Sequence, residues 1–136
     1  MIFNTILILI LNFISTENID HIKDFEWNNR VLIVKDNGKI NFSKKINFNK
    51  KNFDQRDFII IYLREENAFI YNKKMSKYFS NSVLKKIRNT KSEHNLFLIG
   101  KDGQVKKSYS SEVDLERIFN DVDKMPMRKI EMLKQK

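Results

Sequence analysis

The 136-residue chain has no cysteine, only one proline and three glycines, and two histidines. Without cysteine there are no disulfides, no thiolate nucleophile, no cysteine-ligated zinc and no iron–sulfur cluster. Three glycines are too few for a glycine-rich phosphate-binding loop. Thiol oxidoreductase chemistry is therefore excluded, and any other catalytic site would have to be built from His21, His94 and carboxylates.

Basic residues are abundant: 26 lysines and arginines face 17 aspartates and glutamates, which gives a net charge of +9. Four lysine pairs, at positions 44–45, 50–51, 73–74 and 85–86, are interpreted first as solvated surface. The alternative is a lysine-rich face that binds anionic polymers or membrane surfaces, with Phe42, Phe48 and Phe53 available to stack on bases. No nucleic-acid-binding motif accompanies the charge, so nucleic acid is not the expected partner.

The first stretch, Met1 to Ile14, is apolar and carries no charged side chain. It is shorter than the roughly 20 residues that a membrane span needs, and polar residues follow it. Residues 1–16 are therefore predicted to be a signal peptide or a signal anchor, and the protein to be exported to the periplasm or secreted. The alternative is a buried first strand or helix.

The remaining chain has room for one domain, predicted over residues 20–133. Continuous apolar runs predict buried strands at Val31–Val34, Phe58–Leu63 and Leu96–Ile99. The region Ile40–Asp54 reads as an irregular or weakly helical crossover, Ala68–Tyr71 as a short strand or loop, and Met75–Asn89 as a helix. Lys101-Asp102-Gly103 predicts a hairpin into Gln104–Tyr109.

A last main helix is predicted around Leu115–Met125. Ser111, followed by Asp114 three residues later, is the expected N-cap pattern, and Pro126 is expected to end or kink the helix. Two strands joined by a crossover should be parallel. The order therefore predicts an α/β, thioredoxin-like three-layer sandwich, with a central mixed sheet, a C-terminal β-hairpin and a closing helix.

Three segments carry a family resemblance. They are Phe25-x-Trp27-x-x-Arg30-Val31-Leu32-Ile33-Val34, then Phe97-Leu98-Ile99-Gly100-Lys101-Asp102-Gly103-x-Val105-Lys106, then Asp123-x-Met125-Pro126-Met127-Arg128-x-x-Glu131-Met132. In this order they closely resemble the family catalogued as domain of unknown function 4174. The resemblance implies a thioredoxin-like fold related to peroxiredoxins, in short exported bacterial proteins and extracellular sushi-repeat proteins, with no established activity.

This chain departs from redox-active thioredoxins at the decisive position. Their chemistry needs a low-pKa thiolate just after the first core strand. That place reads Val34-Lys35-Asp36-Asn37-Gly38-Lys39 here, so no nucleophile is implied.

Arg30 and Trp27 are the first candidate interaction residues. Arg30 could bind a carboxylate or phosphate bidentately, or stack on the Trp27 indole. The favoured interpretation is structural: Arg30 pairs with Asp24 or Glu26 and covers Trp27 with its stem. Trp27, like Phe25, is predicted to be a core residue rather than a ligand platform.

Met125, Pro126, Met127 and Arg128 form the second candidate. They could dock a partner through flexible methionine side chains. Alternatively, the proline terminates a helix, the methionines cap the core and Arg128 lies near the helix C-terminus. Both interpretations stay open.

Acid–base and metal chemistry have weaker candidates. Glu65 and Glu66 are adjacent and make a poor catalytic pair, and His21 with Asp24 supplies only two possible metal ligands. We predict no catalytic, cofactor-binding or metal-binding residues. The leading hypothesis is a non-catalytic interaction domain for an extracytoplasmic protein partner, contacting a membrane only through an uncleaved N-terminal segment. An enzyme with non-thiol chemistry is the remaining alternative.

Overall fold

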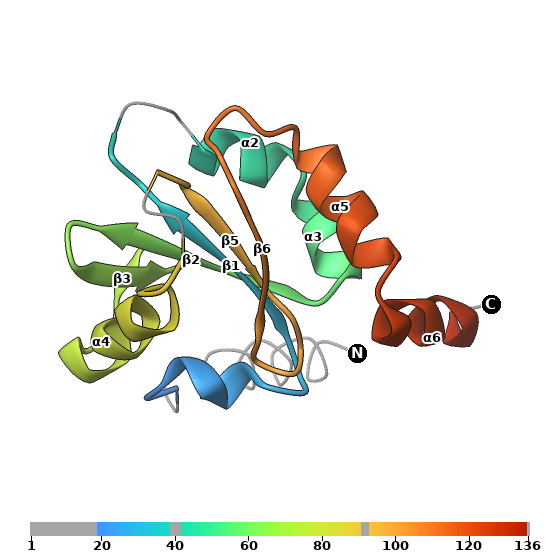
Figure 1. Cartoon of the computed structure of the whole chain (residues 1–136), viewed down its shortest axis with the longest axis horizontal. Coiled ribbons are helices and arrows are strands. Elements are labelled where there is room, and N and C mark those ends of the chain that lie inside the picture. Colours follow the sequence, from blue (N-terminus) through green and yellow to red (C-terminus); the bar gives the residue numbers. More distant parts are fainter. Residues whose placement is uncertain (1–18, 39–41, 91–92, 136) are drawn as a thin grey trace, which may run out of the picture.

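A computed structural model of the chain describes residues 19–38, 42–90 and 93–135, so the predicted signal segment 1–16 lies outside the described residues. Its elements follow one another as a short 3₁₀ turn, strands and helices (Figure 1). In chain order they are η1 (Ile22–Phe25), β1 (Arg30–Lys35), α2 (Phe42–Phe48), α3 (Lys50–Gln55), β2 (Phe58–Arg64), β3 (Asn67–Ile70), β4 (Lys73–Lys74), α4 (Lys77–Lys86), β5 (Leu96–Ile99), β6 (Val105–Tyr109), α5 (Leu115–Asp123) and α6 (Pro126–Lys134).

The strands form one mixed sheet in the order β4-β3-β2-β1-β5-β6. β1 and β2 are parallel, with Arg30 beside Phe58, and every other pair is antiparallel. The prediction of two parallel strands joined by a crossover, followed by a hairpin, is confirmed. The hairpin β3–β4 extends one edge of the sheet beyond the predicted plan.

Helices cover both faces of the sheet (Figure 1). Side chains of β1 alternate between two apolar clusters because successive residues of a strand point to opposite faces. Val31 and Ile33 pack in the first cluster with Phe79 of α4, whereas Leu32 and Val34 pack in the second with residues of α2, α3 and α5. The α/β class is therefore confirmed: a six-stranded mixed sheet with five helices in the described residues.

The crossover is more regular than its composition indicates. Of the two forms expected, irregular or weakly helical, the described residues take the helical one, as two short helices, α2 and α3. Phe42, Ile46 and Phe53 are buried in the second apolar cluster, whereas Phe48 is 91% exposed. Burial of three apolar side chains therefore determines this conformation, despite residues of modest helix propensity.

The start of α5 corrects the predicted cap. The N-cap is Asp114, whose side chain accepts a hydrogen bond from the backbone N–H of Glu116, and not Ser111. Either residue type suits an N-cap, so the pattern alone could not distinguish the two positions. α5 ends at Asp123, and Pro126 then begins a second helix, α6, at the first-turn position where proline is well tolerated.

Trp27 is not a core residue. Phe25 is buried as predicted, but the Trp27 side chain is 65% exposed. The Trp27 backbone has φ of 69°, in the left-handed region, immediately before β1. That conformation takes the indole away from the core that Phe25 enters.

Candidate functional site

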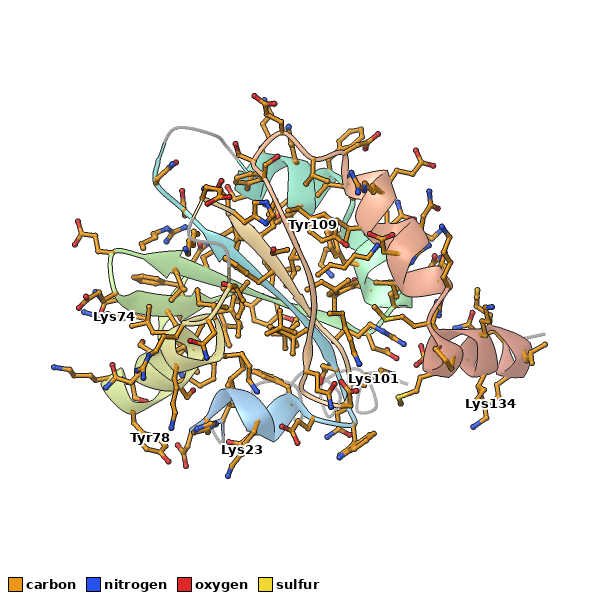
Figure 2. The ribbon with its side chains drawn as sticks, in the orientation of Figure 1. Lys23, Lys74, Tyr78, Lys101, Tyr109 and Lys134 are labelled. Atoms are coloured by element: carbon orange, nitrogen blue, oxygen red, sulfur yellow. The ribbon has the colours of Figure 1, made fainter. Side chains whose placement is uncertain are left out.

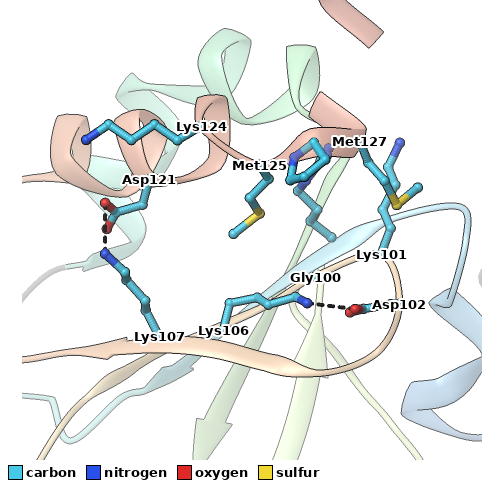
Figure 3. Close-up of a pocket in the computed structure, with 11 residues that line it drawn as sticks. Gly100, Lys101, Asp102, Lys106, Lys107, Asp121, Lys124, Met125 and Met127 are labelled. Carbon is cyan, nitrogen blue, oxygen red and sulfur yellow. Dashed lines mark hydrogen bonds and ion pairs between the residues drawn. The ribbon is translucent and has the colours of Figure 1, made fainter. Parts of the chain in front are cut away.

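The three segments that carry the family resemblance meet at one pocket of about 580 Å³. It lies between the β5–β6 hairpin and the connection from α5 to α6 (Figure 3). The lining residues are Arg30 from the first segment, Gly100, Lys101, Asp102 and Lys106 from the second, Met125, Pro126 and Met127 from the third, and Lys107, Asp121 and Lys124. Arg30 and Gly100, which are 70 residues apart in sequence, thus line a single site.

The turn of the β5–β6 hairpin and the strand β6 that follows it both contribute residues to this pocket. Gly103 has φ of 81°, and a side chain there would collide with the Glu26 carboxylate, so glycine suits the turn that follows Lys101 and Asp102. Further along, the register shifts so that Leu98 pairs with Lys107 but Ile99 pairs with Val105. Lys106 is the extra residue of this β-bulge. Neighbouring strand residues normally face opposite ways, and the bulge lets Lys106 and Lys107 line the same pocket.

The opposite wall is apolar. Met125 is the N-cap residue of α6 and packs partly against the second apolar cluster, whereas Met127 is 38% exposed. Pro126 holds the chain between them with its restricted φ. Met125, Pro126 and Met127 therefore lie together at the pocket, as the docking interpretation requires, and Met125 also serves the core, as the structural interpretation requires.

Cationic side chains outnumber carboxylates around the pocket by five to two. Lys106 pairs with Asp102 at 2.6 Å, and Lys107 pairs with Asp121 at 3.1 Å (Figure 3). Lys124 forms no ion pair within the part of the chain that the structure describes. Arg30 and Lys101 are paired with carboxylates behind the pocket, so its net positive charge rests on Lys124, which is free to meet an anion.

Asp121 is held as an anion. Burial raises the pKa of its carboxyl, but hydrogen bonds from the Tyr109 hydroxyl and Lys107 outweigh burial and lower the pKa below its ordinary value. Burial and the neighbouring Asp121 both raise the pKa of Tyr109. At neutral pH the pocket therefore carries a paired Asp121 carboxylate, held by a neutral Tyr109 phenol that lies outside the pocket lining.

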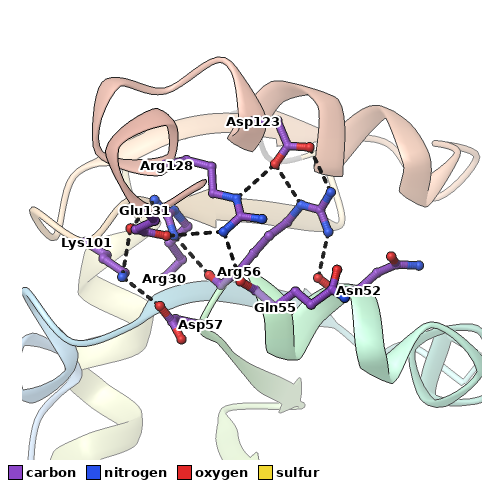
Figure 4. Close-up of polar contacts among 9 residues, drawn as sticks. All are labelled: Arg30, Asn52, Gln55, Arg56, Asp57, Lys101, Asp123, Arg128 and Glu131. Atoms are coloured by element: carbon purple, nitrogen blue, oxygen red, sulfur yellow. Dashed lines mark hydrogen bonds and ion pairs between the residues drawn. The ribbon is translucent and has the colours of Figure 1, made fainter. Parts of the chain in front are cut away.

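Behind the pocket, Arg30 belongs to a buried ionic network (Figure 4). Its guanidinium, 1% exposed, binds Glu131 of α6 bidentately, with Nη1–Oε1 at 3.0 Å and Nη2–Oε2 at 3.1 Å. Lys101 Nζ donates to the same Glu131 at 2.9 Å and to Asp57 at 2.9 Å. The expectation that Arg30 pairs with Asp24 or Glu26 and covers Trp27 is therefore wrong, because its partner comes from a helix 101 residues away in sequence.

Arg128 occupies the same network rather than the pocket lining. It is buried, donates through Nε to Asp123 at 3.1 Å and through Nη1 to the Gln55 carbonyl at 3.0 Å. Asp123 also accepts a bidentate pair from Arg56, at 3.0 and 2.8 Å. Arg128 lies near the N-terminus of α6, so the predicted placement near a helix C-terminus applies only to the preceding helix α5.

The network fixes the charge of its carboxylates. Burial raises the pKa of Glu131, but hydrogen bonds from Arg30 and Lys101 outweigh it and hold that pKa below its ordinary value of 4.5. Burial likewise raises the pKa of Asp123, and Arg56 and Arg128 bring it below its ordinary value. Both groups therefore contribute stability above their ordinary pKa, which is lost as the pH falls.

One donor in this network has no partner among the described residues: Arg30 Nε is buried and unpaired. An unsatisfied buried donor costs about 1–3 kcal/mol, and such groups are uncommon in folded proteins. This N–H is enclosed by the protein, so it is an unpaired donor of the network rather than an accessible contact in the pocket.

Trp27 and the histidines lie elsewhere. The Trp27 backbone N–H donates to the Lys101 carbonyl at 2.6 Å, but its indole does not line the pocket. His21 caps η1 in a reciprocal capping box with Asp24. His94 Nδ1 lies 2.5 Å from Ser108 Oγ in a second pocket, and no carboxylate orients its ring within the described residues.

The described residues contain neither a metal-binding cluster nor a membrane-spanning helix. Across residues 19–38, 42–90 and 93–135, no three His, Asp or Glu side chains gather closely enough to hold a metal ion. In the same residues no helix has the length and apolarity needed to cross a membrane.

The four lysine pairs do not share one face. Those at 44–45 and 50–51 lie on α2 and α3, which cover one side of the sheet, and the pair at 85–86 lies on α4, which covers the other. Phe42 and Phe53, suggested as stacking residues, are buried. This arrangement favours the interpretation of these lysines as solvated surface.

Comparison with known protein families matches the region of the chain that contains the pocket-lining residues. Residues 21–131 match the family model described as Domain of unknown function (DUF4174). The match spans most of the chain and includes the first two segments that meet at the pocket and the third as far as Glu131. No curated protein and no solved structure matches the chain significantly.

Proposed function

The chain belongs to the DUF4174 family, and from the pocket that its characteristic segments build we propose that it is an exported, non-catalytic, thioredoxin-like interaction domain that binds an acidic segment of a partner protein. The observation that carries the proposal is the convergence of the three segments on one electropositive pocket.

The chemistry of the pocket favours an acidic peptide. Lys124, which has no ion pair among the described residues, offers a charged donor to a carboxylate, and Lys106 and Lys107, each paired with an aspartate, line the same pocket. Met125, Pro126 and Met127 offer an adaptable apolar surface to the neighbouring side chains of the same peptide. A bare polyanion would use the cations but leave the methionine wall without a role.

The fold supports the thioredoxin-like assignment. Parallel β1 and β2 are joined by a helical crossover, and the antiparallel β5–β6 hairpin is followed by α5. Without cysteine such a fold cannot exchange disulfides, so we propose binding at its surface, with an enzyme of non-thiol chemistry as the alternative.

Site-specific crosslinking tests the interaction. A photo-crosslinking residue at Met127, in the full chain expressed in its native host, should capture a protein partner, whereas the same residue at Tyr78, which is 65% exposed on α4, should not. Lys124→Glu should reduce capture about tenfold because a charge reversal opposes an anionic ligand. Lys77→Glu, an equivalent reversal on α4, should leave it unchanged. Equal capture at positions 127 and 78, or equal losses in both lysine variants, would refute the proposal.

Export has its own test. Fractionation of the native host, with mass analysis of the intact protein, should place the chain outside the cytoplasm. Either a product that starts near Thr16 or a membrane-bound product that retains Met1 supports export by signal peptide or signal anchor. A cytoplasmic product that retains Met1 would contradict it.

A further inference from the structure

Helix α6 presents Arg128 and Glu131 to the protein and its apolar Ile130 and Leu133 to solvent, which reverses the usual arrangement of a surface helix. Arg128 and Glu131 point into the ionic network, whereas Ile130 is 54% exposed and Leu133 is 69% exposed. The inward pair holds the helix in place through hydrogen bonds, so the outer side chains contribute little to its docking.

The outer face has a definite pattern of charge. At about 100° per residue, Ile130 and Leu133 lie about 60° apart, and Lys129 and Lys134 flank them on either side. Both lysines are exposed, and Figure 2 shows Lys134 directed away from the fold. Glu131 is the only acidic residue of α6 and is paired inward, so no carboxylate offsets the lysines on this face.

Trp27 lies at the same end of the molecule. Its backbone N–H donates to the Lys101 carbonyl, and the Lys101 side chain donates to Glu131 of α6. A positive φ is uncommon for a bulky residue and persists only where the surroundings enforce it. Here that conformation places an indole in solvent, and tryptophan is the residue most typical of the membrane–water interface.

From these observations we infer that Trp27 and the outer face of α6 form a docking surface for an anionic lipid leaflet. An apolar stripe flanked by lysines is the pattern of helices that lie in the interface plane. Two apolar side chains and one indole give weak, reversible binding, and the lysines make it depend on anionic headgroups. The predicted membrane contact thus extends beyond the N-terminal segment to the folded domain.

The experiment uses the native reporter, because Trp27 is the only tryptophan. The full chain is titrated with phosphatidylcholine vesicles and with vesicles containing 30 mole per cent phosphatidylglycerol, while Trp27 fluorescence is recorded. A blue shift is expected with anionic vesicles alone and should weaken as salt is added. No shift with anionic vesicles, or an equal shift with neutral ones, would overturn the inference.

Variants distinguish vesicle binding through this surface from vesicle binding through the N-terminal segment. Ile130→Asp with Leu133→Asp should abolish the shift, and Lys129→Ser with Lys134→Ser should weaken partitioning about 25-fold, since each lysine near an anionic surface strengthens it roughly fivefold. Tyr78→Asp, on α4 at a distance from α6 in Figure 2, should retain the shift.

Two further outcomes would contradict the inference. A shift that survives the double aspartate substitution would assign binding to another part of the chain. A shift that depends on protein concentration without lipid would mean that a second copy covers the face.

Discussion

Glu131→Ala is expected to lower the free energy of unfolding by about 3–5 kcal/mol at neutral pH, because it leaves the Arg30 guanidinium buried without a counter-ion. Arg30 is 1% exposed, and Lys101 loses one of its two carboxylate partners in the same change. The loss is a large fraction of the 5–15 kcal/mol typical of a domain. Urea denaturation of the variant and the native chain, followed by circular dichroism, measures it.

A matched variant distinguishes the buried network from ordinary surface charge. Asp54→Ala removes the carboxylate from the exposed Lys50–Asp54 pair and should change stability by less than about 0.5 kcal/mol. Adding Arg30→Met to Glu131→Ala should recover part of the loss, since it removes the unpaired buried charge. Similar losses for Glu131→Ala and Asp54→Ala would show that Arg30 is solvated in solution.

The lowered pKa of Glu131 predicts how the free energy of unfolding changes in acid. Because the folded-state pKa of Glu131 lies below its ordinary value of 4.5, its contribution is complete above that value and is lost as the pH falls through the lower folded-state pKa. Glu131→Gln should therefore show a smaller loss of stability than the native chain between pH 5 and pH 3.

The central strands were predictable because each is a continuous apolar run with both faces covered. Leu32 and Ile33 pack in different clusters, so no polar residue interrupts the run. The hairpin was predictable from Asp102 and Gly103. These signals are local, and the structure has the strands and the hairpin where they predict them.

The Arg30–Glu131 pair was not predictable, because nothing in the sequence around Arg30 points to a carboxylate at the other end of the domain. Local reasoning offered Asp24 and Glu26, which are nearer in sequence. The exposure of Trp27 was missed for a different reason. An aromatic residue beside a strand ordinarily predicts burial, but the Trp27 backbone has a positive φ and its N–H donates to the Lys101 carbonyl. Met125–Arg128 could be named as a candidate because it belongs to the third segment of the family resemblance and carries flexible methionines, and the structure brings Met125, Pro126 and Met127, but not Arg128, to the pocket.

The crossover shows how tertiary contacts override a weak local signal, and Phe53→Ala tests it. Phe53 lies edge-on to Phe58 of β2, at 5.2 Å between ring centroids, and to Phe119 of α5, at 4.8 Å. Its removal should lower the free energy of unfolding by about 3–5 kcal/mol, because it leaves a cavity between α3, the sheet and α5.

Phe48→Ala is the matched control, since the same residue type in the same crossover is almost fully exposed and should tolerate truncation within about 0.5 kcal/mol. Chemical denaturation of the two variants measures both changes in the free energy of unfolding. If Phe48→Ala cost as much as Phe53→Ala, the crossover would pack with a different face toward the sheet. A large cost for Phe53→Ala alone means that three buried side chains, rather than the helix propensity of a lysine- and asparagine-rich segment, hold α2 and α3 in place.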